Sequence, residues 1–312
     1  MKQLHKKLLG IIILIALIAW LVYYGISNYE QFKEVSFENP LLLVLIAIIF
    51  LFAYLPISVI TYYLILPFGV NLGKRESFGL SIVTGFYNLI TPFRGGMAVR
   101  GIYLNKKYGF SYTNFLATLA ASYILTFFIA AILGLFSILN IYLTRDIISW
   151  PILTIFSGMF LIFFIVIVFS PKIPETRYQF INRFVNVLNG WHLIKNNRKI
   201  IIAVSLMSIF QLLLGALSTY LQFRVFGIVI SLSAAIFLAA MGSLSLLISI
   251  TPAGLGINEA ILVFSASTLG ITPIQSLSAA LAGRFVSIIV LFTLGPIFSY
   301  ILKKGRDNEK HL

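Results

Sequence analysis

The stretch SLLISITPAGLGINEA (residues 245–260) interrupts one of the most apolar parts of the chain. An apolar helix is expected to stop at Thr251-Pro252, because proline cannot continue a helix. Gly254 and Gly256 follow, and glycine allows sharp turns and close approach of another group. Glu259 then places a carboxylate in the next apolar run, where an unpaired charge is costly. A broken helix beside a carboxylate predicts a functional site inside a membrane.

The composition of the whole chain favours an all-α polytopic membrane protein. Of its 312 residues, 60% are hydrophobic and only 10% are charged, whereas a soluble domain carries about 25% charged residues. Apolar runs of about 20 residues, long enough to cross a bilayer as helices, recur along the chain. The longest polar stretch, residues 171–199, is too short for a stable soluble core. We therefore expect a single transmembrane domain over residues 1–312.

Several classes of site are excluded by what the sequence lacks. With no Cys there can be no disulfide or thiolate metal site, and the three His residues are scattered. We find no Walker loop, nucleophile elbow or Ser/His/Asp set, so we predict no cofactor, no metal and no catalytic residue. The net charge of +14 could suggest nucleic acid. The basic residues fall in short loops, however, which favours a role in orienting membrane spans and no nucleic-acid partner.

The apolar runs predict six full transmembrane helices. They are expected at residues 8–27, 40–66, 112–142, 150–170, 200–226 and 274–302. The first resembles a signal peptide, but no small-residue cleavage site follows it, so we expect it to be retained. Lys and Arg are concentrated in alternate loops, which predicts that these loops and both termini are cytoplasmic. The expected location is the cytoplasmic membrane of a prokaryote.

This orientation requires two re-entrant hairpins. Lys74 and Lys106 are both expected in the cytoplasm, yet one apolar segment separates them. Residues 77–105 must therefore enter the membrane and return, with the turn at Thr91-Pro92. By the same count, residues 233–269 enter and return from the outside. Non-helical backbone at such a depth survives only where protein or a watery cavity surrounds it.

The two predicted hairpins are also alike in sequence. TPFRGGMAVR (residues 91–100) aligns with TPAGLGINEA (residues 251–260), and the segments GFSYTNFLATLAASY and GITPIQSLSAALAGR that follow align as well. We therefore predict an inverted repeat of residues 40–142 and 200–302, a pattern typical of transporters. Residues 171–199 would link the halves as a basic amphipathic helix on the cytoplasmic leaflet, with Trp191 on its apolar face.

The second arms of the hairpins predict an anion site. A helix that begins near the midplane presents unpaired N–H groups, and its dipole also favours an anion. Gly95, Gly96, Gly254 and Gly256 stand at these two helix starts. We expect the starts to face one shared cavity that suits a phosphate or another anionic headgroup.

Charged side chains near the turns are further candidates for this site. Arg94 would bind a phosphate with two parallel hydrogen bonds, whereas Arg100 faces either the cavity or the cytoplasmic surface. Glu259 and Arg284 form either a structural ion pair or a coupling and headgroup site, and a further alternative is that Arg284 extends its side chain to the membrane interface. In the second case Glu259 would bind a cation, take a proton or hold an arginine. The sequence leaves open whether Glu259 pairs with Arg284, with Arg94 or with neither.

Uncharged polar residues inside the spans could add hydrogen bonds to the site. Asn88, Asn258 and Gln211 are such residues, and each has ordinary packing between helices as its alternative role. Arg224, near the end of a span, is expected at the membrane interface.

The two turns and the segments after them resemble the lysylphosphatidylglycerol synthase transmembrane region, also called the flippase-like integral membrane family. The more specific match is TPAGLGINEAILVFSASTLGITPIQSLSAALAGR, with its Pro-x-Gly-x-Gly-x-x-Glu core and later arginine. The resemblance covers nearly the whole chain and implies the standalone form, because no synthase domain follows Leu312. It implies a flippase for an anionic or aminoacylated phospholipid or a polyprenyl-linked lipid. Its functional positions fall on Arg94, Gly95, Gly96, Arg100, Pro252, Gly254, Gly256, Glu259 and Arg284.

The sequence supports four hypotheses for function. The leading one is a lipid translocase, not an enzyme, whose partners are membrane lipids with anionic headgroups. The alternatives are an enzyme that modifies a lipid headgroup, with Glu259 as its acid or base, a small-ion transporter, and a scaffold for a separate lipid-modifying enzyme. The lipid, the direction of transport, the energy coupling and the oligomeric state are left open.

Overall fold

The structure is a computed structural model that describes residues 37–146, 148–170, 174, 177, 179–248 and 250–309, without the side chains of 179–181, 183–184 and 305–309. Within these ranges the chain is helical and has no strand. The expected first span, residues 8–27, lies outside the described residues.

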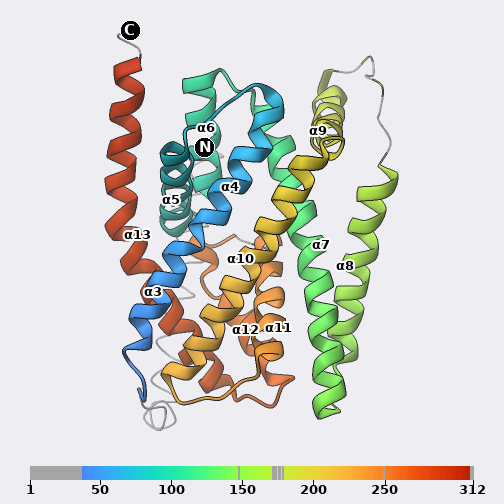
Figure 1. Cartoon of the computed structure of the whole chain (residues 1–312), viewed down its shortest axis with the longest axis vertical. Helices are drawn as coiled ribbons and strands as arrows, with labels where there is room; N and C mark the ends of the chain where they lie inside the picture. The colour runs from blue at the N-terminus through green and yellow to red at the C-terminus, as the bar shows by residue number, and fades with distance from the viewer. Residues whose placement is uncertain are drawn as a thin grey trace, which may run out of the picture.

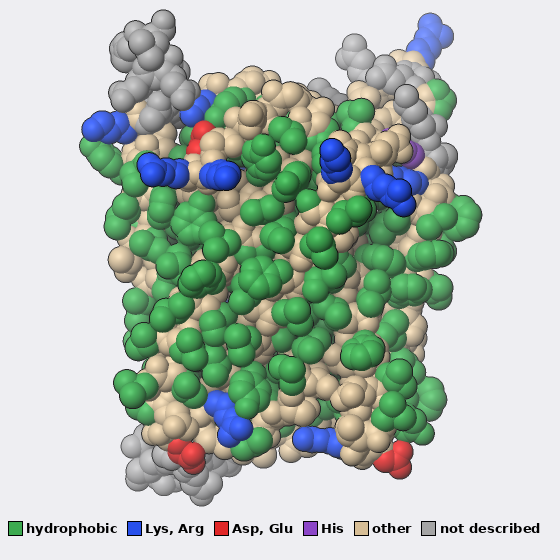
Figure 2. Space-filling view, viewed as in Figure 1, with side chains coloured by type: hydrophobic (Ala, Val, Ile, Leu, Met, Phe, Trp, Pro, Cys, Tyr) green, Lys and Arg blue, Asp and Glu red, His purple; other side chains and the backbone are tan. Residues whose placement is uncertain are grey.

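Five helical stretches are long and apolar enough to cross a membrane, as the sequence predicted for the described part of the chain. The first combines α3 (Leu42–Phe52), α4 (Tyr54–Ile65) and the 3-10 helix η1 (Leu66–Phe68). The others are α7 (Tyr112–Arg145), α8 (Trp150–Phe169), α10 (Arg198–Val225) and α13 (Pro273–Glu309). A belt of hydrophobic side chains covers the middle of the molecule, and the charged side chains lie toward its two ends (Figure 2). The protein is therefore a multi-pass membrane protein.

Two pairs of shorter helices lie among these spans. The first pair is α5 (Lys74–Ile90) and α6 (Gly95–Tyr108). The second is α11 (Leu232–Ser243) and α12 (Ile257–Ser267), with the 3-10 helices η2 (Leu244–Leu247) and η3 (Pro252–Gly254) between them. With 11 to 17 residues each, these four helices are shorter than the roughly 20 residues that a transmembrane helix needs. The chain turns back after each first arm, close to the predicted positions.

The turns of the two pairs meet in the middle of the molecule. In Figure 1 α5 and α6 occupy the upper half, and α11 and α12 occupy the lower half. The backbone N–H of Phe93 in the first turn donates to the carbonyl of Ile250 in the second, at 3.0 Å. Helix α5 also packs against η3. The two short pairs thus support each other end to end.

Both turns hold residues in the left-handed region of backbone space. Phe93 and Arg94 have φ of 53° and Ala253 also has φ of 53°, while Gly254 and Gly256 have φ of 63° and 80°. For a residue with a side chain this conformation costs about 1–2 kcal/mol. Such strain persists only where the surrounding structure fixes it, and the contact between the turns provides that constraint.

A small polar cluster around Glu76 holds α5 and α6 together at the end of this helix pair that lies away from its turn. Its carboxylate accepts hydrogen bonds from the hydroxyls of Tyr103 and Tyr108, each at 2.7 Å, and lies 3.2 Å from Lys107 Nζ. Burial, followed by the bond to Glu76, raises the pKa of Tyr108 to about 12. The phenol therefore stays a donor at neutral pH, and the cluster joins the start of α5 to the end of α6.

Helix α9 (Gln179–Lys195) differs in one respect from the expectation of a helix on the leaflet surface. Trp191 and Ile194 are buried, 2% and 0% exposed, in a cluster with residues of α4, α7 and α10. Trp191 Nε1 also donates to Ser170 Oγ at 3.1 Å. Part of the apolar face therefore packs on the protein, because the ends of α4 and α7 offer it an apolar surface.

Replacing Gly96 with alanine should loosen the first helix pair. A Cβ at this position would lie 1.9 Å from the backbone oxygen of Thr84, so α6 would have to move away from α5. We expect a loss of about 1–3 kcal/mol, the usual cost of overpacking, measured as a lower Tm of the purified protein in detergent. Gly158→Ala is the matched control, since its Cβ would meet nothing within 4 Å. Equal melting temperatures for the two variants would contradict the close packing.

Candidate functional site

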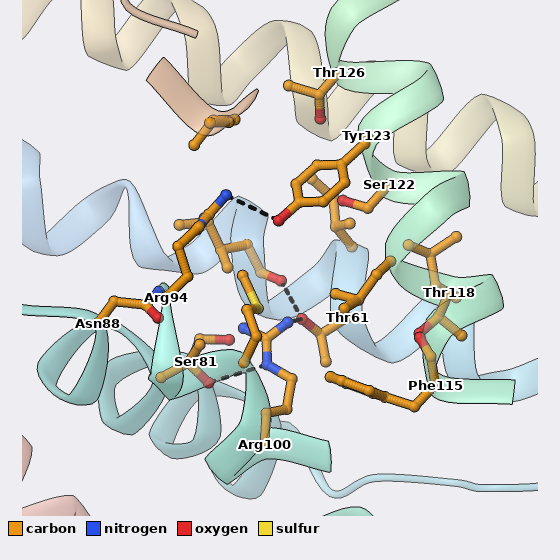
Figure 3. A pocket seen from close by; sticks show the side chains of 18 of the residues that line it. Thr61, Ser81, Asn88, Arg94, Arg100, Phe115, Thr118, Ser122, Tyr123 and Thr126 are labelled. Atoms are coloured by element: carbon orange, nitrogen blue, oxygen red, sulfur yellow. Dashed lines mark hydrogen bonds between the residues drawn. The ribbon is translucent and has the colours of Figure 1, made fainter. Parts of the chain in front are cut away.

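A cavity of about 220 Å³ lies beside the first turn, and two arginines point into it (Figure 3). We call it the arginine cavity. Its polar lining consists of Tyr54, Thr61, Ser81, Thr84, Asn88, Arg94, Arg100, Thr118, Ser122, Tyr123, Thr126 and Gln211. These residues come from helices α4, α5, α6, α7 and α10 and from the turn before α6. The site therefore depends on the packing of five helices.

Arg100 is buried in this cavity, with 7% of its surface exposed. Its Nε donates to Thr84 Oγ1 at 3.0 Å and its Nη1 donates to Thr61 Oγ1 at 3.1 Å. Both hydroxyls give their own hydrogen to a carbonyl one helical turn earlier, Leu80 O and Ile57 O. Their lone pairs are thus left to accept from the guanidinium. The structure resolves the orientation of Arg100 in favour of the cavity over the cytoplasmic surface.

Arg94 approaches the same cavity from the turn. Its Nη1 donates to the hydroxyl of Tyr123 at 2.8 Å, and the guanidinium carbon lies 5.6 Å from the centre of that ring. This contact combines a hydrogen bond with an attraction between the cation and the ring face. Because Arg94 is itself in the left-handed conformation, the turn directs its side chain away from the course of α6.

Among the described residues, no carboxylate balances these two charges. None of the residues that line the arginine cavity is Asp or Glu, and no described residue forms an ion pair with Arg94 or Arg100. A guanidinium has five N–H donors, of which Arg94 uses one and Arg100 two in these bonds. The lining also has one unpaired acceptor, the buried side-chain oxygen of Asn88, which has no hydrogen-bond partner among the described residues and would need a donor such as a water or a hydroxyl. The cavity thus offers positive charge and free donors to an anion.

A second cavity, of about 350 Å³, lies beside the second turn. We call it the ion-pair cavity, because its lining includes Glu259 and Arg284, together with Gln222 and Asn258. Glu259 Oε1 accepts from Arg284 Nε at 2.5 Å, and Oε2 accepts from the backbone N–H of Gly256 at 2.7 Å. The side chains are 6% and 12% exposed. Glu259 therefore pairs with Arg284, and it also caps the start of α12.

The structure divides the predicted site residues between two cavities. Arg94 and Arg100 line the first, and Asn258, Glu259 and Arg284 line the second, whereas one shared cavity was expected. The helix starts do not frame a common space, because the turns contact each other directly.

The predicted glycines line neither cavity. Gly95 and Gly96 pack against Thr91 and Thr84 of the preceding arm, and Gly254 packs against Asn258. Thr91, Pro92, Thr251 and Pro252 form the turns themselves. Asn258 Nδ2 donates to Ala253 O at 2.9 Å and so braces the second turn.

Of the remaining polar candidates, Asn88 and Gln211 line the arginine cavity. Arg224 lies away from both cavities, at the end of α10, where it donates from Nε and Nη2 to the hydroxyl of Tyr220. This contact has the same chemistry as the pair of Arg94 and Tyr123.

The partners of the two cavity arginines were missed by sequence reasoning. Thr61 and Thr84 are ordinary residues of apolar helices, and nothing in their spacing predicts a role. Tyr123 carried a signal, because it aligns with Arg284 when the two halves are superposed in sequence. Each is the side-chain partner of a charged residue beside its own turn, Arg94 and Glu259 respectively.

Comparison with known proteins identifies relatives of the whole chain. The family described as "Lysylphosphatidylglycerol synthase TM region" matches residues 7–295. The UPF0104 membrane protein MJ1595 of Methanocaldococcus jannaschii is 26% identical over 336 residues, which cover 99% of this chain and 98% of that protein. No solved structure matches the chain significantly.

Replacing Glu259 with glutamine should destabilise the protein strongly. Arg284 would be left nearly buried without a counter-charge, and breaking a buried pair in this way costs about 3–5 kcal/mol. We expect the Tm in detergent to fall, and to recover partly in Glu259→Gln/Arg284→Gln, where no charge is left unpaired. A double variant as unstable as the sum of its single variants would show that the two side chains do not act as a pair.

Proposed function

Because the chain belongs to the lysylphosphatidylglycerol synthase transmembrane-region family, we propose that it is a lipid translocase for a lipid with an anionic headgroup. The observation that carries the proposal is the arginine cavity, in which Arg94 and Arg100 have no carboxylate partner in the part of the chain that the structure describes. The headgroup enters this cavity while the acyl chains stay in the bilayer. In this proposal the chain performs no covalent step.

The electrostatics of the cavity support an anionic headgroup. Arg100 is buried and Arg94 is half-buried, and charges held away from bulk water in a membrane protein are costly unless something balances them. A phosphate that accepts from both guanidiniums would supply this balance through charge-assisted hydrogen bonds. Glu259 is assigned no proton or cation, because both of its oxygens already have partners.

The proposal places the two short helix pairs as re-entrant hairpins of an inverted repeat. Lys and Arg gather at the end of the molecule that holds the start of α5, the end of α6 and the start of α10, which the proposal assigns to the cytoplasm with both termini. The pair of α5 and α6 then enters from the cytoplasm and that of α11 and α12 from outside. Motion of one half against the other would open the cavity to alternate sides.

Single cysteines should reveal this topology, since the natural chain has none. Cysteines in place of Lys74 and Lys106, both exposed, should react with an impermeant maleimide from the same side of the membrane. Cysteines in place of Leu232 and Thr272, also exposed, should react from the opposite side. The side from which each cysteine reacts is measured by comparing its labelling in intact cells with its labelling in inverted membrane vesicles. If positions 74 and 106 react from opposite sides, α5 and α6 do not form a re-entrant hairpin.

Arg94→Gln and Arg100→Gln should each slow lipid transfer about tenfold or more, because a hydrogen bond to a charged group contributes about 1.5–3 kcal/mol. The assay follows chain-labelled phosphatidylglycerol and phosphatidic acid between the leaflets of proteoliposomes, with phosphatidylcholine as the neutral lipid. Arg224→Gln is the matched control, since it removes an arginine with the same tyrosine contact outside the cavity. Equal rates in all three variants would remove the arginine cavity from the transport path.

A further inference from the structure

The charge of the arginine cavity also bears on the chemical class of the lipid headgroup, given the proposed function. We infer that the headgroup ends in a phosphate monoester and is neither a phosphodiester nor an aminoacylated headgroup. Three features of the cavity carry this inference: its charge, the lack of a described carboxylate that could pair with an ammonium group, and its size.

The balance of charge favours a dianion. Arg94 and Arg100 bring two positive charges to a lining whose described residues include no Asp or Glu. A phosphate monoester has a second pKa near 6 and carries about −1.5 to −2 charges at pH 7. A phosphodiester carries a single charge at every pH in this range, so one guanidinium would stay unbalanced in the membrane. Of these two ester classes, only the monoester neutralises both guanidiniums.

The donors left in the cavity also match a terminal phosphate. Arg94 donates one described hydrogen bond and Arg100 donates two, so each guanidinium retains N–H groups for a ligand. A phosphate monoester has three oxygens that are not part of an ester bond, and several of them can accept hydrogen bonds from the two arginines at once. A diester presents only two such oxygens.

An aminoacylated headgroup would find no described carboxylate to balance its ammonium group, although the side-chain oxygen of Asn88 is an uncharged acceptor in the lining. Ammonium groups in buried sites pair with carboxylates, and the arginine cavity has none among its lining residues. Glu259 lies in the other cavity, where Arg284 and the N–H of Gly256 occupy its two oxygens. Placing an ammonium beside Arg94 and Arg100 would instead bring together like charges.

The volume of the cavity is consistent with a small headgroup. At about 220 Å³ it is smaller than the roughly 300–1,000 Å³ of ordinary ligand pockets. A terminal phosphate with a few waters is the kind of group that such a space takes. A glycerol bearing an amino acid would add a bulky segment that a cavity of this volume does not suit.

The test compares three lipids with identical acyl chains in proteoliposomes between pH 5 and pH 8. They are phosphatidic acid (a phosphate monoester), phosphatidylglycerol (a phosphodiester) and lysylphosphatidylglycerol. At pH 8 we expect transfer of phosphatidic acid about tenfold faster than that of either other lipid. Its rate should rise with pH as the second proton leaves, because the dianion balances both arginines. The rate for phosphatidylglycerol should stay flat, because a diester does not titrate in this range.

Variants tie the pH dependence to the cavity. Arg94→Gln and Arg100→Gln each leave one positive charge, so both should abolish most of the preference for phosphatidic acid and flatten its pH profile. Arg224→Gln should change neither. If a Gln variant does not fold, Arg94→Lys or Arg100→Lys takes its place. Lysine keeps the charge but loses the planar guanidinium that forms two parallel hydrogen bonds, so phosphatidic acid transfer should be slower but its rate should still rise with pH.

Equal or faster transfer of phosphatidylglycerol or lysylphosphatidylglycerol at pH 8 overturns the monoester inference but leaves the translocase. Transfer of none of the three lipids overturns both. Thermal stabilisation of the protein by soluble glycerol 3-phosphate as large as that by phosphatidic acid would assign the cavity to a free phosphate ester, and the inference of a lipid would be wrong.

Discussion

Backbone N–H and C=O groups inside a membrane must find partners within the protein, and the two turns of this chain find them in each other. The hydrogen bond from Phe93 to Ile250 joins a turn near residue 92 to one near residue 252. It closes the space where a common cavity was expected. It also fixes the first turn, so that Arg94 in its left-handed conformation reaches Tyr123.

The contact between the turns separates two environments with opposite electrostatic character. On one side Glu259 and Arg284 neutralise each other, and Glu259 also satisfies the first N–H of the second arm. On the other side Arg94 and Arg100 are held by hydroxyl groups, which orient a guanidinium without cancelling its charge. The first arrangement is neutral in itself, whereas the second carries charge that the proposed anionic headgroup would balance. This asymmetry, more than the likeness of the halves, is the reason for placing the proposed ligand in the arginine cavity.

Hydroxyl partners suit such a site because they leave the arginines available. A carboxylate beside Arg100 would pair with it strongly and compete with any incoming anion, as Glu259 pairs with Arg284 in the other cavity. Thr61 and Thr84 instead accept from the guanidinium with lone pairs oriented by their own bonds to the preceding helical turn. The close approach of Gly96 to Thr84 brings α6 near enough for Arg100 to use these groups.

The sequence by itself determined the helical spans, the positions of the two turns and most of the charged candidates. These depend on local properties, namely the length of an apolar run, the helix-ending effect of Pro92 and Pro252, and the cost of a charge in apolar surroundings. Only the tertiary structure decided that Glu259 pairs with Arg284, that Arg100 lies in a cavity with Thr61, and that the cavities are two. The physical reason is that pairing between side chains depends on which helix faces lie side by side, and a run of apolar residues does not specify its neighbours.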